Sequence, residues 1–138
     1  MIITQSVDYE LIRQIMTEPQ IWQEICGIYG GIIEEFHPIV DGYIYLIGYD
    51  KLDIIGLFII HPQDSDFMCH VQVLPEKRKE YSFEFGKEVI QWTWDNTDIN
   101  KLIALIPEKF KNVISFAESQ GFHITGKKDS DVMMKIER

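Results

Sequence analysis

Cysteine and basic residues are scarce in this sequence, and each shortage excludes a class of protein. The two cysteines, Cys26 and Cys69, are too few for a disulfide framework, so we expect reduced thiols and a cytoplasmic location. The 13 basic residues stand against 22 acidic ones and leave a net charge of −9. Because general nucleic-acid binders show a basic face, we expect no nucleic-acid partner.

Long apolar runs are absent as well. The longest, around Ile54 to Ile60, is too short to cross a bilayer, and the N-terminus lacks the basic and apolar regions of a signal peptide. We therefore expect no membrane partner. The sequence also lacks repeats, linkers and low-complexity segments, so its 138 residues predict a single domain over residues 1–138.

The sequence lacks most of the motifs that identify a chemistry. It contains no serine-triad spacing, Cys-x-x-Cys pair, P-loop or dinucleotide fingerprint. His37, His61 and His123 stand singly, without the spacing of metal ligands. We expect each of them to be a loop or strand-end residue, and we expect no metal site.

The most informative stretch runs from Cys69 to Trp94. Apolar residues alternate with polar or small ones up to Pro75, which predicts a strand that ends there. Residues 76–80 carry mixed charges, so we expect a solvated loop, although its basic side chains could contact a phosphate. A helix from Ser82 to about Trp94 is predicted next, because its apolar residues recur at three- and four-residue spacing.

The rest of the chain divides into short helices and strands by the same patterns. Before the central stretch we predict a strand over residues 1–5, a helix that Ser6 or Asp8 caps and that runs to Met16, and a second helix from Pro19 that Gly27, Gly30 and Gly31 end. An irregular bridge over residues 32–40, a hairpin of residues 43–49 with 54–60, and a loop over residues 61–66 follow. After it we predict a strand, a helix and two closing strands: residues 101–106, a helix that Pro107 opens and Gly121 ends, residues 122–125 and residues 131–136.

Two predictions concern how these elements pack. The strand ending at Leu74 and the strand starting at Lys101 are joined through a helix, so they should be parallel with a right-handed crossover. The last helix should bury one apolar face, which carries Phe110, Val113, Ile114 and Ala117.

The segment Val73-Leu74-Pro75-Glu76-Lys77-Arg78 resembles the start of the acetyl-CoA signature of the GNAT superfamily of N-acetyltransferases. The predicted element order, β-α-α-β-β-β-α-β-α-β, is also similar to the GNAT order over essentially the whole chain. The resemblance implies an α+β (α/β/α) fold with a mixed, mostly antiparallel central sheet and four helices.

The sequence departs from the GNAT signature, Gln/Arg-x-x-Gly-x-Gly/Ala, where the coenzyme would bind. With Arg78 setting the register, Tyr81 and Phe83 take the two small positions. Glycine there lets the backbone approach a pyrophosphate, and two aromatic rings would fill that space. We therefore expect no cofactor; if acetyl-CoA binding is retained, Arg78, Lys79 and Ser82 are the residues that would hold it.

The last helix departs from the GNAT pattern too. In catalytic members it often reads Asn-x-x-Ala-x-x-x-Tyr-x-x-x-Gly-Phe, and the Tyr is a general acid toward the leaving thiolate. Counting back from Gly121 places Ala117 at the Tyr and Phe110 at the Asn, although Asn112 is close enough for a shifted register. His70 stands where such enzymes sometimes place a catalytic base, but we expect a partly buried strand residue with a hydrogen-bond partner.

Two function classes remain open. We expect a non-catalytic GNAT-fold protein that acts as a protein-interaction factor, because the missing glycines and the strand end from His70 to Arg78 resemble small proteins of tailed phages. That resemblance implies head-assembly or virion-associated work, in the host cytoplasm or the virion. The alternative is an enzyme, a divergent acyl-CoA-dependent N-acetyltransferase.

An interaction role also follows from the number of large apolar residues between Tyr81 and Trp94. Trp92 and Trp94 lie about 200° apart on a helix, so both cannot face one core. We expect Tyr81, Phe83 and Trp94 to contact a protein partner or a second copy of the chain. Alternatively, Tyr81 and Phe83 fill the vacant groove and the protein is monomeric.

Overall fold

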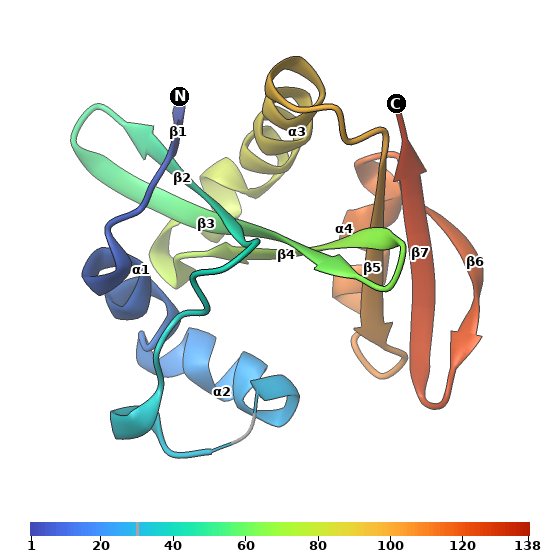
Figure 1. The fold of residues 1–138 in the computed structure, drawn as a ribbon, viewed down its shortest axis with the longest axis horizontal. Coiled ribbons are helices and arrows are strands. Elements are labelled where there is room, and N and C mark those ends of the chain that lie inside the picture. The colour runs from blue at the N-terminus through green and yellow to red at the C-terminus, as the bar shows by residue number, and fades with distance from the viewer. Residues whose placement is uncertain (30) are drawn as a thin grey trace.

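A mixed sheet runs through the middle of the computed structural model, which describes residues 1–29 and 31–138, with side chains for 1–25 and 31–138 (Figure 1). Its seven strands lie in the order β1-β2-β3-β4-β5-β7-β6. The strands are β1 (Ile2–Gln5), β2 (Ile44–Asp50), β3 (Asp53–Gln63), β4 (Asp66–Val73), β5 (Lys101–Pro107), β6 (His123–Lys128) and β7 (Asp131–Glu137). The helices are α1 (Tyr9–Met16), α2 (Pro19–Tyr29), α3 (Arg78–Asn96) and α4 (Lys111–Ser119), with 3-10 turns η1 (Ile33–Glu35) and η2 (Pro75–Lys77).

The predicted fold class is confirmed. Every described strand pair is antiparallel except β4 with β5, which is parallel as the crossover through α3 requires. Helices α3 and α4 pack on one face of the sheet, and α1 and α2 pack on the other. The chain ends in two strands, β6 and β7, where the predicted order string has one. None of the described helices is long and apolar enough to cross a membrane.

The first two helices form where the sequence predicts them. The side chain of Asp8 caps α1 by accepting a hydrogen bond from the Leu11 N–H at 3.1 Å. Pro19 opens α2, because its missing N–H would have no partner in a first turn. The helix continues through Gly27 to Tyr29, so the predicted stop at Gly27 is wrong, and Gly30 lies outside the described residues.

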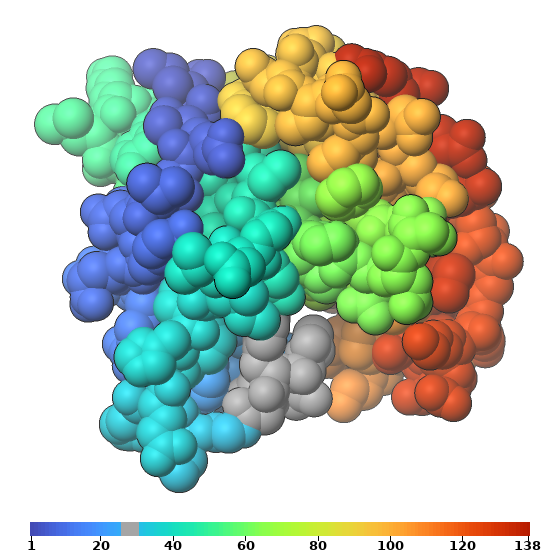
Figure 2. All heavy atoms as spheres, in the orientation of Figure 1, coloured from blue at the N-terminus to red at the C-terminus, as the bar shows by residue number. Residues whose placement is uncertain are grey.

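The predicted loop over residues 61–66 is mostly strand. β3 continues to Gln63 and β4 starts at Asp66, so only a two-residue turn remains between them. Pro62 is tolerated there because β2 starts opposite Ile60 and leaves the end of β3 paired on one side only. Figure 2 shows the green β3–β4 hairpin in the centre of one face, between the cyan segment before β2 and the closing strands.

The charged stretch after β4 is helical and not the predicted loop. Pro75 opens the turn η2, in which the Lys77 N–H donates to the Leu74 carbonyl at 2.8 Å. α3 then begins at Arg78, four residues earlier than the predicted start at Ser82. Because proline is favoured in the first turn of a helix, the residue that ends β4 also starts the helical path.

The last helix begins later than predicted. Pro107 is the final residue of β5 and pairs with Asp131, and α4 starts at Lys111. Its end is as predicted, since Gly121 adopts a φ of +106°. The predicted apolar face is only half buried: Ile114 and Ala117 lie in the core, whereas Phe110 and Val113 are exposed.

The central helix lies very close to the sheet. Phe85 of α3 is fully buried over two glycines, Gly48 on β2 and Gly56 on β3. A Cβ on Gly48 would lie 2.6 Å from the Phe85 ring, and a Cβ on Gly56 would lie 2.6 Å from the Gln72 carbonyl oxygen. The two glycines therefore provide the room that lets α3 dock.

Substitution of Gly56 tests this close packing. Gly56→Ala should lower the free energy of unfolding by about 1–3 kcal/mol, because the clashing oxygen belongs to the backbone of β4. Urea denaturation followed by tryptophan fluorescence measures the change. Gly126→Ala is the matched control, since a Cβ there meets no atom within 4 Å. Equal losses in the two variants would contradict the packing described for Gly56.

Candidate functional site

A cleft forms where β4 and β5 separate. Among the described residues the two strands pair only at Met68 and Ile103. Toward their carboxyl ends, residues 69–73 of β4 and 104–107 of β5 line a cleft of about 700 Å³. Because these two strand edges do not pair with each other, backbone groups along them can face a ligand, although the Val73 carbonyl already accepts a hydrogen bond from Arg78.

Helix α4 supplies much of the apolar lining of the cleft. Phe110, Val113 and Phe116 line it, together with Ile106 of β5. This explains why the apolar face of α4 is divided, with part of it in the core and part of it on the cleft. Sequence periodicity cannot distinguish the two, because a ligand cleft and a core are both lined by apolar residues.

The polar residues of the cleft gather near the start of α3. Arg78 Nε donates to the Val73 carbonyl at 2.9 Å, and its two terminal nitrogens donate to both carboxylate oxygens of Glu24 on α2 at 2.8 and 2.9 Å. Ser82 lines the cleft one turn further along α3, while Lys79 is exposed and lies outside the lining. Lys109 and Lys111 add positive charge at the α4 end.

Gln120 contributes an unsatisfied acceptor to the lining. It is 7% exposed and its Nε2 donates to the Phe83 carbonyl at 3.2 Å. Its Oε1 is buried and has no hydrogen-bond partner among the residues that the structure describes. Gly86 makes room for this side chain, because a Cβ there would lie 2.8 Å from the Gln120 amide carbon. A buried acceptor without a donor is costly, and a ligand N–H would relieve it.

His70 lies on the β4 side of the cleft and contacts a second histidine. Its Nε2 is 3.0 Å from the Nε2 of His61 on β3. Burial, and next the neighbouring His61, lowers the pKa of His70 to about 4, so the ring is neutral at neutral pH. The expectation of a partly buried, hydrogen-bonded strand residue is confirmed for His70. His61 is buried in β3, two residues before the end of that strand, so the prediction that it lies in a loop is wrong.

Cys69 is a buried thiol on the lining of the same cleft. Burial raises its pKa to about 12, which keeps the sulfur protonated and unreactive as a nucleophile. The side chain of Cys26 lies outside the described residues.

Comparisons with known proteins agree with this architecture. No protein-family model and no curated protein matches the sequence. Among solved structures, Campylobacter jejuni N-acetyltransferase PseH with acetyl coenzyme A matches with a TM-score of 0.70 at 9% identity, over 99% of each chain. Vibrio cholerae spermidine N-acetyltransferase with CoA and spermine matches at 0.64 and 15%, over 98% of this chain and 95% of that one. Aminoglycoside acetyltransferase AAC(6')-Ib with coenzyme A and kanamycin matches at 0.73 and 11%, over 99% and 95%.

The chain has the GNAT fold. At these identities the likeness concerns the fold alone, and function has to be argued from the site. The expected resemblance to phage assembly proteins receives no support from these structures and stays a prediction.

The two aromatic residues at the small positions of the GNAT signature do not line the cleft. The Tyr81 hydroxyl donates to an Asp50 carboxylate oxygen, and this bond raises the pKa of Tyr81 to about 12. Phe83 is 53% exposed, with the Lys87 Nζ 4.9 Å from its ring centroid. The expectation that the two rings fill the cleft is therefore wrong.

Tyr81 and Phe83 point away from the cleft because α3 starts earlier than predicted. Arg78, Ser82 and Gly86 are four residues apart and share one face of α3, which points into the cleft. Tyr81 and Phe83 project to other sides of the same helix. The four-residue spacing of these three residues was the signal that sequence reasoning missed, because the predicted helix began only at Ser82 and left Arg78 in a loop.

The expected interaction residues are only partly exposed. Trp92 and Trp94 are both half-buried and packed against the core, as is Tyr81. Phe83 is the one that presents its ring to solvent. Contact of Tyr81, Phe83 and Trp94 with a partner chain stays a prediction.

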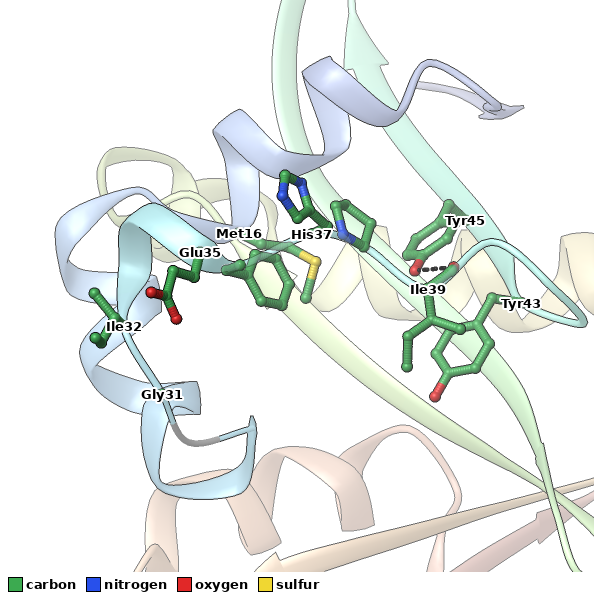
Figure 3. Close-up of a pocket in the computed structure, with 10 residues that line it drawn as sticks. Met16, Gly31, Ile32, Glu35, His37, Ile39, Tyr43 and Tyr45 are labelled. Atoms are coloured by element: carbon green, nitrogen blue, oxygen red, sulfur yellow. Dashed lines mark hydrogen bonds between the residues drawn. The ribbon is translucent and has the colours of Figure 1, made fainter.

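A second hollow of about 310 Å³ lies beside the segment between α2 and β2 (Figure 3). Arg13 of α1 holds this segment, because its guanidinium donates to the Phe36 and Ile33 carbonyls at 2.9 Å each. Figure 3 also shows the Tyr45 hydroxyl donating to the Ile39 carbonyl, at 2.7 Å. The described residues contain no group of three or more potential metal ligands, here or elsewhere.

The unsatisfied Gln120 oxygen gives a stability prediction. Gln120→Met should raise the free energy of unfolding by about 1 kcal/mol, because it removes a buried acceptor without a donor and keeps the side-chain length. Chemical denaturation of the ligand-free protein measures this. Gln14→Met, at an exposed position on α1, should change stability by less than about 0.5 kcal/mol. A Gln120→Met variant less stable than the wild type would contradict this expectation and show that the amide stabilises the fold, through its bond to the Phe83 carbonyl or through a partner of the oxygen.

Proposed function

We propose that this protein binds an acyl-coenzyme A in the cleft between β4 and β5 and transfers the acyl group to an amine. The observation that carries the proposal is the open cleft itself, with two strand edges on its sides that do not pair with each other and cationic residues at its ends. The solved structures of the same fold whose names include coenzyme A or acetyl coenzyme A support the choice of ligand.

The lining fits the chemistry of coenzyme A. Its pantetheine arm carries amides on a mostly apolar chain, and strand edges can hydrogen-bond amides while Val113 and Phe116 cover the apolar parts. The orphaned Oε1 of Gln120 lacks a donor of the kind that an amide N–H or an exocyclic amine provides. For the phosphates, Arg78 and Ser82 stand at the start of α3, whose N-terminus has no side-chain cap.

Arg78 is shared between this role and an ion pair. Glu24 neutralises the guanidinium fork in the structure, so a phosphate would have to compete with that carboxylate. The two side chains are partly exposed, and such pairs contribute only about 0–1 kcal/mol. The competition is therefore weak, and Arg78 can turn to a phosphate.

His70 is the residue positioned to assist the chemistry. An acyl thioester reacts with an amine when the nitrogen forms a bond to the carbonyl carbon, the carbon–sulfur bond breaks and the amine loses a proton. His70 lies on the cleft wall, where it can contact the attacking amine; burial lowers its pKa to about 4, so it is a weak base, and the proton that the amine loses goes to the leaving thiolate. Ala117, at the position of the GNAT tyrosine, cannot supply a proton to the thiolate.

The amine is of a cationic class. The net charge of −9 favours the approach of positively charged acceptors through long-range attraction. Two of the matching structures carry amines in their names, spermine and kanamycin, and these serve as first probes.

A non-catalytic role as a protein-interaction factor is the second candidate. The observation that favours it is the exposed ring of Phe83, together with an alanine where the GNAT tyrosine would stand. Exposed aromatic residues are frequent anchors of interfaces. Work in phage head or virion assembly would be one form of this role.

Acetyl-CoA binding tests the first proposal. Calorimetric titration should show saturable one-to-one binding, and saturating ligand should raise the melting temperature because it binds only the folded state. Arg78→Gln should weaken binding about tenfold or more, the loss expected for one charge-assisted hydrogen bond. Lys79→Gln is the matched control, since it removes the same charge one residue away from a side chain outside the cleft. No binding by the wild type, or equal weakening in both variants, would refute the assignment of the cleft.

Turnover is a separate question from binding. Release of free thiol from acetyl-CoA in the presence of spermine or kanamycin measures it. If acetyl-CoA binds but no primary amine of a panel causes thiol release, the protein binds the coenzyme without transferring the acyl group, and the interaction role is favoured.

A further inference from the structure

The lining of the cleft is positively charged, although the protein as a whole is acidic. The chain has a net charge of −9, yet among the described residues of the lining the cations Arg78, Lys109 and Lys111 stand against one carboxylate, that of Glu24. Local charge of the opposite sign to the rest of the surface attracts a ligand of that opposite kind, so this cleft favours an anion.

The cations of the cleft occupy two separate places. Arg78 begins α3, the helix that follows β4, whereas Lys109 and Lys111 flank the start of α4, the helix that follows β5. Because β4 and β5 are the strands that separate, the two places lie beyond the carboxyl ends of opposite walls. A ligand that satisfies both places carries anionic groups at two points.

The cations at α4 are less neutralised than Arg78, which is bonded to a carboxylate of α2. In the part of the chain that the structure describes, Lys109 and Lys111 form none of the ion pairs. The neighbouring Glu108 is bonded to Lys127, which lowers its pKa, and Lys111 adds a smaller part to that lowering. A second anion can therefore bind at α4 without displacing a carboxylate.

An aromatic ring stands between the two lysines in the sequence. Phe110 lines the cleft and is 37% exposed, and the Lys109 Nζ lies 5.3 Å from its ring centroid. Such a contact is weak at an exposed site, so the lysine can exchange the ring for a phosphate. A ring with ammonium groups beside it suits a purine nucleotide, whose base stacks on the ring while its phosphate bonds to the ammonium groups.

We propose that Lys109, Phe110 and Lys111 form the subsite for the nucleotide end of the coenzyme, in which adenine stacks on Phe110 and the lysines bind the 3′-phosphate of the ribose. This rests on the proposed binding of an acyl-coenzyme A in the cleft. Coenzyme A has anionic groups at two points, a pyrophosphate beside the pantetheine arm and the 3′-phosphate beyond it. The first falls to Arg78 and the second to the lysines of α4.

The α2 side of the cleft is less suitable for the 3′-phosphate. Once Arg78 turns to the pyrophosphate, the carboxylate of Glu24 loses its partner and repels a second phosphate there. The subsite at α4 also gives the protein a way to select its acyl donor. A donor that presents phosphopantetheine alone, as a carrier protein does, lacks both the base and the 3′-phosphate that this subsite binds.

Titration calorimetry with coenzyme A and dephospho-coenzyme A, which lacks only the 3′-phosphate, tests the lysines. At one fixed ionic strength, the wild type should bind coenzyme A about tenfold or more tightly than the dephospho form, the ratio expected for one charge-assisted bond. Lys109→Gln combined with Lys111→Gln should reduce this preference to within twofold, by weakening coenzyme A and leaving the dephospho form unchanged.

A second pair of lysines provides the matched control. Lys79→Gln combined with Lys87→Gln removes the same charge from exposed positions of α3 outside the cleft lining, and should keep the preference. An equal loss of preference in the two double variants would show long-range attraction and overturn the subsite. A loss in the control alone would place the 3′-phosphate on α3 and overturn it as well.

The ring is tested with a ligand that lacks the nucleoside. Phe110→Leu should weaken dephospho-coenzyme A about threefold or more and leave 4′-phosphopantetheine within twofold, because only the former has a base to stack. Phe110→Trp keeps a flat ring and should bind dephospho-coenzyme A as the wild type does. Unchanged binding of dephospho-coenzyme A by Phe110→Leu would overturn the stacking.

These outcomes are distinct from a failure of the proposed function. A wild type that binds coenzyme A and dephospho-coenzyme A equally overturns the subsite and leaves acyl-coenzyme A binding in the cleft standing. A wild type that binds neither of them overturns both. A wild type that binds with the expected preference but transfers no acyl group supports the subsite and overturns the transfer.

Discussion

The separation of β4 from β5 is the constraint on which the rest of the structure depends. These strands are the one parallel pair of the described sheet, and the crossover through η2 and α3 lets them touch at Met68 and Ile103 before they separate. α3 can make this crossover close to the sheet because Gly48 and Gly56 leave room for Phe85. The cleft is thus a product of strand pairing and of two missing side chains under the central helix.

The cleft gathers residues from both faces of the sheet. Arg78 and Ser82 arrive from α3, Gln120 comes from the end of α4, and His70 stands on β4 with His61 behind it on β3. The separation of the two strands is what brings these residues around one cleft. In the proposed reaction the net charge of −9 would favour a cationic acceptor, and the apolar walls would favour the apolar arm of the coenzyme.

Much of the fold could be predicted from the sequence, and parts of the site could not. Periodicity gave the element order and the parallel crossover, because both follow from local apolar patterns and chain connectivity. It missed the buried position of His61, because Pro62 beside it indicates a loop unless the neighbouring strand is known to end first. The resemblance to the GNAT signature wrongly placed Tyr81 and Phe83 in the coenzyme space, because α3 starts at Arg78 and this helical start changes the direction of each later side chain.

The central claim is that the space between β4 and β5 binds acetyl-CoA, and a chemical-shift titration tests it most directly. Backbone amide resonances of ¹⁵N-labelled protein should move on addition of acetyl-CoA at residues 71–73, at 104–106 and in the first turn of α3. Amides of β1 and β6, at the two edges of the sheet, should stay in place. If only the amides of the sheet edges or those around Phe83 shift, and the amides that line the cleft do not, the account is contradicted.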